Sequence, residues 1–112
     1  MYLNLKTKKI KNMEKMKFVI VRTDRAGVHM GYLKECSPVA GFHDVTLVNT
    51  RRIWSWAGAN SISDLAIKGS RKPNDCKITA PVIENKMMAI EVIEVSENGK
   101  KELDSIPNWT FE

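Results

Sequence analysis

Cysteine and histidine are scarce in this sequence, and neither is arranged for chemistry. The chain of 112 residues has 2 cysteines, Cys36 and Cys76, and 2 histidines, His29 and His43. Two cysteines outside a CxxC pair are too few for a disulfide framework or a zinc site, so we expect reduced, partly buried thiols. The sequence also lacks a metalloprotease spacing, a P-loop, a GxGxxG motif and a nucleophile motif. We therefore predict that the protein is not an enzyme and uses no cofactor or metal.

Long hydrophobic runs are also absent. No segment approaches the roughly 18 apolar residues of a membrane span, and no apolar stretch follows the lysine-rich start as in a signal peptide. The composition, 43% hydrophobic and 28% charged, is that of an ordinary globular domain. The length fits one domain with a modest core. We expect a single cytoplasmic domain with no membrane partner.

Excess positive charge is missing from most of the chain, although the net charge is +5. Residues 1–17 contain six lysines and one glutamate, whereas the chain from Phe18 onward has 12 basic and 12 acidic residues. A duplex-binding protein needs a basic surface for its phosphate contacts, so nucleic acid is not expected as a partner. We interpret residues 1–16 as a flexible basic N-terminal extension, either without function or acting as an arm, and residues 17–112 as one α+β domain.

What the sequence does contain is a series of short segments rich in β-forming residues. Residues 17–23 predict a strand, residues 24–27 a tight turn, and residues 28–34 the antiparallel partner of that strand. Residues 36–43, which include a proline and a glycine, predict a loop, and residues 44–49 predict a third strand. The first half of the domain is therefore expected to be a small antiparallel sheet.

The second half adds helices to the sheet. Residues 51–56 either continue the third strand or turn into a fourth. Ser61 and Asp64 have the spacing of a helix start, and Gly69 is typical of a helix end. Further along, the pattern predicts a short strand at 76–80, the longest strand at 87–95 and one or two helical turns at 99–105. The predicted fold class is α+β, a small antiparallel twisted sheet or partly open β-barrel with one short inserted helix and a short C-terminal helix.

Two arginines and two of the 3 tryptophans lie close together in the middle of the chain. In an extended segment, alternation places Arg52, Trp54 and Trp56 on one face, with Arg51 and Ile53 on the other. Bases stack on indoles and phosphates pair with guanidinium groups, so this face favours a nucleotide-like ligand over a sugar or a lipid. The alternative is that both tryptophans belong to the core and that Arg52 lies at its rim.

A longer pattern of residues surrounds these tryptophans. It comprises Val21-Arg22-Thr23-x-x-Ala26-Gly27-Val28-His29-x-Gly31, then Arg51-Arg52-Ile53-Trp54-x-Trp56-x-Gly58-Ala59-x-Ser61-Ile62-x-x-Leu65-Ala66, and Lys72-Pro73-x-x-Cys76-Lys77. With this pattern, residues 17 to about 95 resemble a family of small phage and prophage proteins of unknown function. The resemblance implies a phage origin and the cytoplasm of an infected bacterium. The chain is also similar to the oligomeric anti-defence sponges, of the Thoeris- and CBASS-inhibitor type, that trap cyclic ADP-ribose isomers or cyclic oligonucleotides.

A sponge must hold a small anionic nucleotide ligand without cleaving it, which requires arginines, an aromatic surface and a few polar donors. The candidate ligand-binding residues are Arg22, Arg25, Asn49, Arg51, Arg52, Trp54, Trp56 and Ser61, with Thr23 and Asn60 as further polar contacts. Ser61 precedes a helix whose free N–H groups favour an anion, although an ordinary helix cap is the commoner role. Nanomolar binding requires about 12 kcal/mol, so several contacts must converge, which is easier if two protomers share the site.

Self-association is predicted from the strand at 87–95, which is largely apolar on both faces and needs cover twice. We expect a homo-oligomer, a dimer or a multiple of it. Three functions stay open at this stage: a nucleotide sponge, a protein-binding inhibitor such as an anti-CRISPR, and a minor structural or regulatory phage protein. A sponge returns an intact ligand on denaturation, an inhibitor forms a stable protein complex, and the third does neither.

Overall fold

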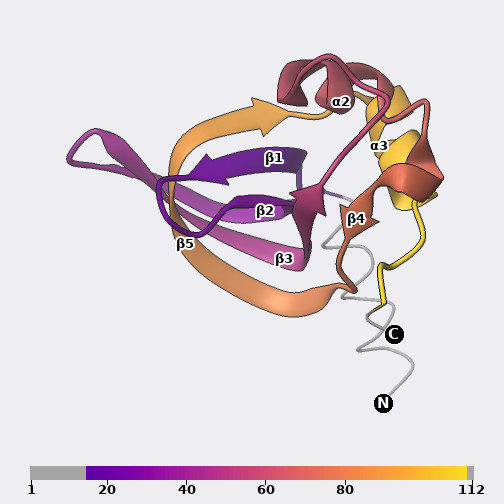
Figure 1. The fold of residues 1–112 in the computed structure, drawn as a ribbon. Coiled ribbons are helices and arrows are strands. Elements are labelled where there is room, and N and C mark those ends of the chain that lie inside the picture. Colours follow the sequence, from indigo (N-terminus) through magenta and orange to yellow (C-terminus); the bar gives the residue numbers. More distant parts are fainter. Residues whose placement is uncertain (1–14, 111–112) are drawn as a thin grey trace.

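The structure, a computed structural model, describes residues 15–110. The elements in chain order are β1 (Phe18–Thr23), β2 (Val28–Val39), β3 (Phe42–Ser55), α2 (Ile62–Lys68), the 3₁₀ helix η1 (Pro73–Asp75), β4 (Lys77–Ile78), β5 (Val82–Glu94) and α3 (Glu97–Asp104) (Figure 1). Almost all of the predicted N-terminal extension, residues 1–14, lies outside the described residues.

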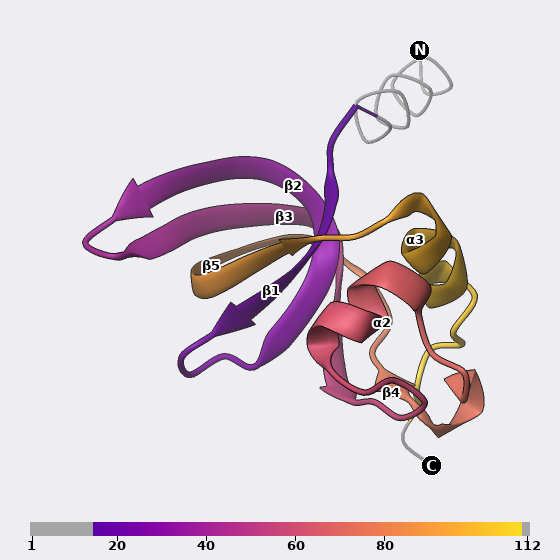
Figure 2. The ribbon, with the colours of Figure 1, turned by 90° about the horizontal axis from the view of Figure 1, so that it is seen from above.

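The strands form one antiparallel sheet that curls back on itself. Its order is β2-β1-β5-β3-β4, and β2 pairs with β3 as well as with β1. The pairings therefore run in a circuit through β1, β2, β3 and β5, while shifts of register at several points keep the circuit from being a regular barrel. Figures 1 and 2 show β4 and both helices at one end and the β2–β3 hairpin projecting at the other. The predicted α+β fold, a small twisted sheet with short helices, is confirmed.

Two hydrophobic cores lie on opposite faces of β1. Phe18 and Ile20 join a core that includes side chains of both helices, which we call the helix-side core. Val19 and Val21 join a second core whose other members come from β3 and β5, so the curled sheet encloses it. We call this the inner core. Because β1 is covered on both faces, four successive residues of this strand are buried, which explains its continuous apolar run.

The predicted loop at residues 36–43 is wrong. β2 runs on to Val39 and pairs with β3 as far as Phe42, so that a tight turn at 40–41 closes a long hairpin. Pro38 lies within this hairpin, in its projecting part, where a missing N–H donor is tolerated.

The third predicted strand is longer than expected and includes the arginine and tryptophan motif. Asn49 has a left-handed backbone conformation, φ 51°, which asparagine tolerates and which lets β3 continue past an irregularity to Ser55. Residues 51–55 therefore continue β3, the first of the two alternatives. β3, with 14 residues, is also longer than β5, with 13, which the sequence predicts to be the longest.

Both predicted helices are present and short. Ser61 caps α2 by accepting a hydrogen bond from the Asp64 N–H, and Gly69 ends the helix with φ 71°. Ser96 caps α3 in the same way and its N–H donates to Ala66 of α2, which joins the two helices. With seven and eight residues, α2 and α3 are far below the roughly 20 residues that cross a bilayer, and the part of the chain described here has no longer helix.

Candidate functional site

β3 sends neighbouring arginines to opposite faces of the sheet. Arg51 is opposite Met30 of β2, a residue of the helix-side core, whereas Arg52 is opposite His29. His29 is in turn opposite Val21, a residue of the inner core. Arg51 therefore points toward the helices, and Arg52 points to the other face.

Arg51 is a structural residue. The residue is 9% exposed, and burial lowers the pKa of its guanidinium while nearby Asp104 raises it. Its donors reach the carbonyl groups of four residues, namely Thr79 at 2.8 Å, Ile106 at 3.0 Å, Ile78 at 3.4 Å and Leu103 at 3.5 Å. This one side chain thus ties β4 and the end of α3 to β3. A ligand-binding role for Arg51, as predicted, does not fit this placement.

The two tryptophans of the motif do not share a face. Trp54 is 64% exposed, whereas Trp56 is half-buried against the helix-side core. The predicted alternation fails because β3 ends at Ser55 and the chain then turns through Gly58, φ 77°, whose missing side chain leaves room for the backbone of Lys72. The prediction of a common aromatic face is wrong for Trp56, which takes the core role given as the alternative.

A groove lies between the β1–β2 turn and the end of β3. It has a volume of about 650 Å³ and is lined by Arg25, Ala26, Gly27, Val28, Arg52, Ile53 and Trp54. We call it the Arg52–Trp54 groove. Arg25 is almost fully exposed and lies 3.8 Å from the carboxylate of its neighbour Asp24. By contrast, within residues 15–110 no carboxylate comes within ion-pair distance of the Arg52 guanidinium.

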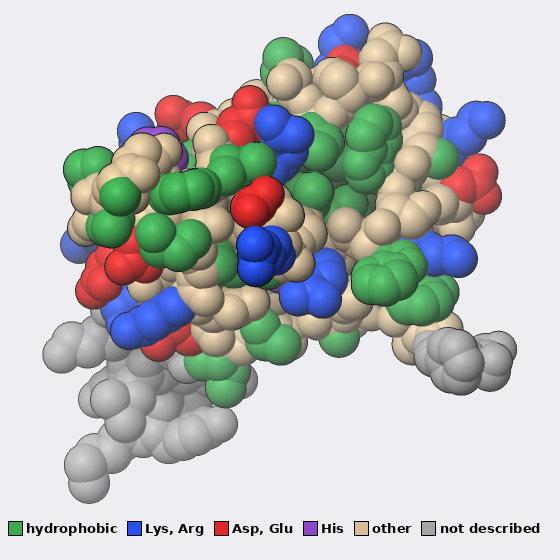
Figure 3. Space-filling model, turned by 60° about the vertical axis from the view of Figure 1, so that its left-hand side comes forward, with side chains coloured by type: hydrophobic (Ala, Val, Ile, Leu, Met, Phe, Trp, Pro, Cys, Tyr) green, Lys and Arg blue, Asp and Glu red, His purple; other side chains and the backbone are tan. Residues whose placement is uncertain are grey.

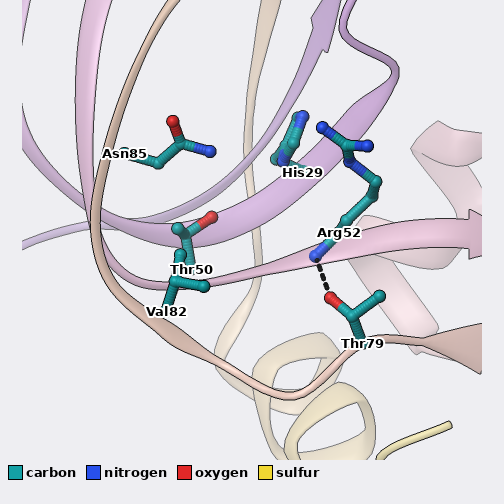
Figure 4. A pocket seen from close by; sticks show the side chains of 6 residues that line it. All are labelled: His29, Thr50, Arg52, Thr79, Val82 and Asn85. Atoms are coloured by element: carbon teal, nitrogen blue, oxygen red, sulfur yellow. Dashed lines mark hydrogen bonds between the residues drawn. The ribbon is translucent and has the colours of Figure 1, made fainter. Parts of the chain in front are cut away.

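A smaller pocket adjoins the groove and shares Arg52 with it. It measures about 230 Å³ and is lined by His29, Thr50, Arg52, Thr79, Val82 and Asn85. We call it the His29 pocket. Figure 4 shows the Arg52 guanidinium beside the His29 ring, with the Asn85 amide on the other side of the ring. Arg52 is the one residue that lines both cavities.

His29 is a buried, neutral histidine in this setting. The residue is 2% exposed, and Nε2 lies 2.7 Å from the Ala26 carbonyl oxygen, so this nitrogen is the one that donates. Burial lowers the pKa of His29, the hydrogen bond to Ala26 raises it, and the positive charge of Arg52 lowers it further. The ring is therefore uncharged at neutral pH, with Nε2 engaged as a donor and Nδ1 left as the acceptor nitrogen.

The other predicted site residues lie elsewhere or stabilise the chain locally. Arg22 forms a 2.6 Å ion pair with Glu91, and it lies on the face of β1 opposite to Val21. Asn49 lines a separate pocket beside Arg51. The remaining polar candidates serve the backbone: Thr23 bonds to Ala26 and Gly27 within the β1–β2 turn, Ser61 caps α2, and the N–H of Asn60 donates to Asp64.

Of the predicted set, the groove thus brings together Arg25, Arg52 and Trp54, while Asn49 and Arg51 line a separate pocket. The adjoining pocket adds residues that were not predicted from the sequence. These are His29, Thr50, Thr79 and Asn85. The signal for His29 is its position opposite Arg52, which becomes readable only when the register of β2 against β3 is known. Among residues 15–110, no three His, Cys, Asp or Glu side chains come together in a group that could hold a metal ion.

Hydrophobic side chains are also exposed on β5. Met87 and Ala89 belong to the inner core, whereas Met88 and Ile90, which alternate with them along the strand, are each 43% exposed. Figure 3 shows hydrophobic side chains in several patches, separated by charged ones, on one face of the molecule. One face of β5 is therefore covered within the chain, and the other presents apolar side chains at the surface.

Comparison with known proteins yields a family and no function. Neither a curated protein nor a solved structure matches the chain. A family profile matches residues 16–103, a range that contains the whole sheet, α2, almost all of α3, and every residue that lines the groove and the pocket. The chain therefore belongs to the family described as Domain of unknown function (DUF6948).

Proposed function

We propose that the protein binds a small, phosphate-bearing, nucleotide-like ligand in the Arg52–Trp54 groove and releases it unchanged. The observation that carries this proposal is the placement of an exposed indole beside a guanidinium that no carboxylate of residues 15–110 engages. Indoles stack on bases, and guanidinium groups bind phosphate oxygens. Both groups come from the same face of one strand, so the fold holds them in fixed relation.

Binding without chemistry is favoured by the lining of the groove. Of its residues, only Arg25, Arg52 and Trp54 carry polar side-chain atoms, and none of these is a nucleophile or a base at neutral pH. The histidine next to the groove, His29, is buried and lines the adjoining pocket rather than the groove itself. We propose sequestration of a nucleotide-derived immune messenger, a cyclic ADP-ribose isomer or a cyclic oligonucleotide, as the biological role. This last step rests on the resemblance to phage proteins.

The binding free energy that one groove can supply favours a site shared by two copies of the chain. A base stack contributes about 1–3 kcal/mol, and each charge-assisted hydrogen bond contributes about 1.5–3 kcal/mol. With Arg25, Arg52 and Trp54 the contacts sum to about 4–9 kcal/mol before the cost of association, short of the ~12 kcal/mol of a nanomolar complex. We propose that a second copy completes the site, with the exposed Met88 and Ile90 of β5 as the apolar surface available for self-association.

A protein-binding inhibitor is the second candidate. Tryptophan and arginine are the residue types that dominate protein interfaces, and here Trp54, Arg25 and Arg52 lie together on one exposed groove. This alternative predicts a stable complex with a defence protein and no affinity for small nucleotides.

Calorimetry against a panel of cyclic nucleotides, including cyclic ADP-ribose and cyclic dinucleotides, tests the proposal. We expect at least one to bind, and we expect Trp54→Ala to weaken its binding by about 1–3 kcal/mol. Trp109→Ala is the matched control, because this indole is also exposed but lies outside the groove, 5.4 Å from the Lys77 ammonium. Mass spectrometry of the ligand released by denaturation should find it intact. No binding across the panel, or a cleaved ligand, would contradict the proposal.

A further inference from the structure

The His29 pocket is rich in hydrogen-bond donors and has no carboxylate in its lining. The Arg52 guanidinium and the Asn85 amide are both donors that make no side-chain hydrogen bond to another described residue. Figure 4 shows the two on either side of the His29 ring. Donors without protein acceptors, next to a fixed positive charge, are what an anion requires.

The Thr79 hydroxyl is a third donor, because its oxygen accepts a hydrogen bond and its proton is not used. Its Oγ1 accepts a hydrogen bond of 3.0 Å from the Arg52 backbone N–H. The hydroxyl proton therefore stays available for a ligand. Thr50 behaves differently, since its hydroxyl donates to the Met30 carbonyl at 3.0 Å, so it offers only lone pairs to the pocket. The donors outnumber the acceptors that remain.

The size of the pocket limits what enters it. About 230 Å³ is less than the roughly 300–1,000 Å³ of pockets that enclose a complete small-molecule ligand. The pocket therefore takes one chemical group, and the remainder of the ligand must lie outside. The neighbouring Arg52–Trp54 groove, which contains the exposed indole, begins at the shared Arg52.

We propose that the His29 pocket is an anion subsite for a single phosphate group, bound by Arg52, Asn85 and Thr79, while the rest of the ligand lies along the groove. The inference rests on the proposed function for the identity of that remainder. The subsite itself requires only an anion of phosphate size. Sulfate is a suitable probe, because it has this size and its charge stays constant around neutral pH.

His29 gives the subsite a distinctive response to pH. The groups that face its ring are Arg52 from β3, the Ala26 carbonyl from the β1–β2 turn and Asn85 from β5, and none of these is negative. An anion in the pocket adds the missing negative charge and so favours the protonated ring. Anion binding should therefore take up a proton, and sulfate should bind more tightly at pH 6 than at pH 8.

The test is a titration of the ¹⁵N-labelled full chain with sulfate, with chloride added to hold the ionic strength constant. We expect the side-chain N–H signals of Arg52 and Asn85 to shift with a saturable dependence on sulfate. Arg52→Gln should weaken sulfate binding about tenfold or more and Asn85→Ala about three- to tenfold. Arg71→Ala, which removes an exposed guanidinium 3.9 Å from Asp64 and outside the pocket, should leave binding unchanged.

The pH dependence has its own control variant. His29→Gln keeps a donor for the Ala26 carbonyl but cannot gain a proton, so it should bind sulfate equally at pH 6 and pH 8 while remaining folded. Sulfate shifts that are absent from Arg52 and Asn85, or that Arg71→Ala reduces as much as Arg52→Gln does, would overturn the subsite. If sulfate binds in the pocket but no nucleotide binds, the subsite stands and the proposed function fails. If a nucleotide binds through Trp54 but sulfate leaves the pocket unaffected, the function stands and the subsite fails.

Discussion

Arg51 and Arg52 are adjacent in β3, and their surroundings have little in common. Arg51 is buried on the helix side, where its donors are taken up by backbone carbonyl groups of β4 and the end of α3. Arg52 is exposed on the other face, where its guanidinium borders two cavities and no carboxylate of residues 15–110 neutralises it. A single step along a strand thus separates an arginine that holds the fold from one that is available to a ligand.

The two tryptophans of the motif, Trp54 and Trp56, show the same contrast. Trp56 packs against the helix-side core, while Trp54 leaves most of its indole in solvent. The motif therefore contains one arginine and one tryptophan that stabilise the fold, and one of each that is exposed and available to a ligand. Mutating the four residues one at a time, and measuring both stability and ligand binding of each variant, distinguishes the stabilising residues from the ligand-binding ones.

We expect Arg51→Ala to lose the most stability. Removing this side chain leaves buried carbonyl groups without donors, and we expect a loss of about 3 kcal/mol in the free energy of unfolding. Arg52→Ala removes an exposed side chain and should change stability by less than about 0.5 kcal/mol. Urea unfolding of both variants checks this. Equal losses would show that the two arginines do not differ as described.

The two tryptophan variants should show the next largest difference in stability. Trp56→Ala removes a half-buried indole and should cost about 2–3 kcal/mol of stability, less than a fully buried tryptophan would. Trp54→Ala should unfold at nearly the same urea concentration as the wild type. A Trp54 variant that is as unstable as the Trp56 variant would place both indoles in the core and remove the exposed aromatic surface.

A smaller effect is expected from pH. Since the pKa of His29 is lowered in the folded state, the unfolded chain takes up this proton first when the pH falls below about 6.5. The wild type should therefore lose stability as the pH is lowered from 7 toward 5.5. Above pH 7, His29 is neutral in both states and adds nothing to the pH dependence of stability. His29→Gln should show a flatter profile in thermal unfolding over this range. Identical profiles would mean that His29 titrates alike in both states.

The smallest effect is expected at Arg22. Its ion pair with Glu91 is partly exposed on both sides, and such pairs contribute about 0–1 kcal/mol. Arg22→Ala should therefore unfold within about 1 kcal/mol of the wild type, and its nucleotide affinity should be unchanged because Arg22 lies on the other face of β1 from Val21. A marked loss of nucleotide affinity would show that Arg22 does belong to the binding site.

The sequence allowed the order of strands and helices to be predicted, because alternation and capping are local. Ser61, Asp64 and Gly69 marked the bounds of α2 by short-range chemistry. The long β2–β3 hairpin was missed because Pro38 and Gly41 are common in loops, and only pairing with β3 shows that the strand continues. Local rules also fail at Asn49, whose left-handed conformation extends β3 instead of ending it.

The candidate site could be predicted only in part, for a similar reason. Arg52 and Trp54 follow from alternation within one strand, whereas Trp56 departs from it because β3 ends one residue earlier. His29 and Asn85 join Arg52 through the registers of β2 and β5, which link residues far apart in the chain. The burial of Arg51 likewise depends on carbonyl groups of β4 and α3 that no spacing rule reveals.

Whether the Arg52 side chain binds the ligand can be decided by one calorimetric comparison. The nucleotide of the panel that binds the wild type most tightly is titrated into Arg52→Ala and into the control Arg71→Ala. We predict a loss of about 1.5–3 kcal/mol in binding free energy for Arg52→Ala and none for Arg71→Ala. Equal affinities of the two variants, with both proteins folded, would contradict the account.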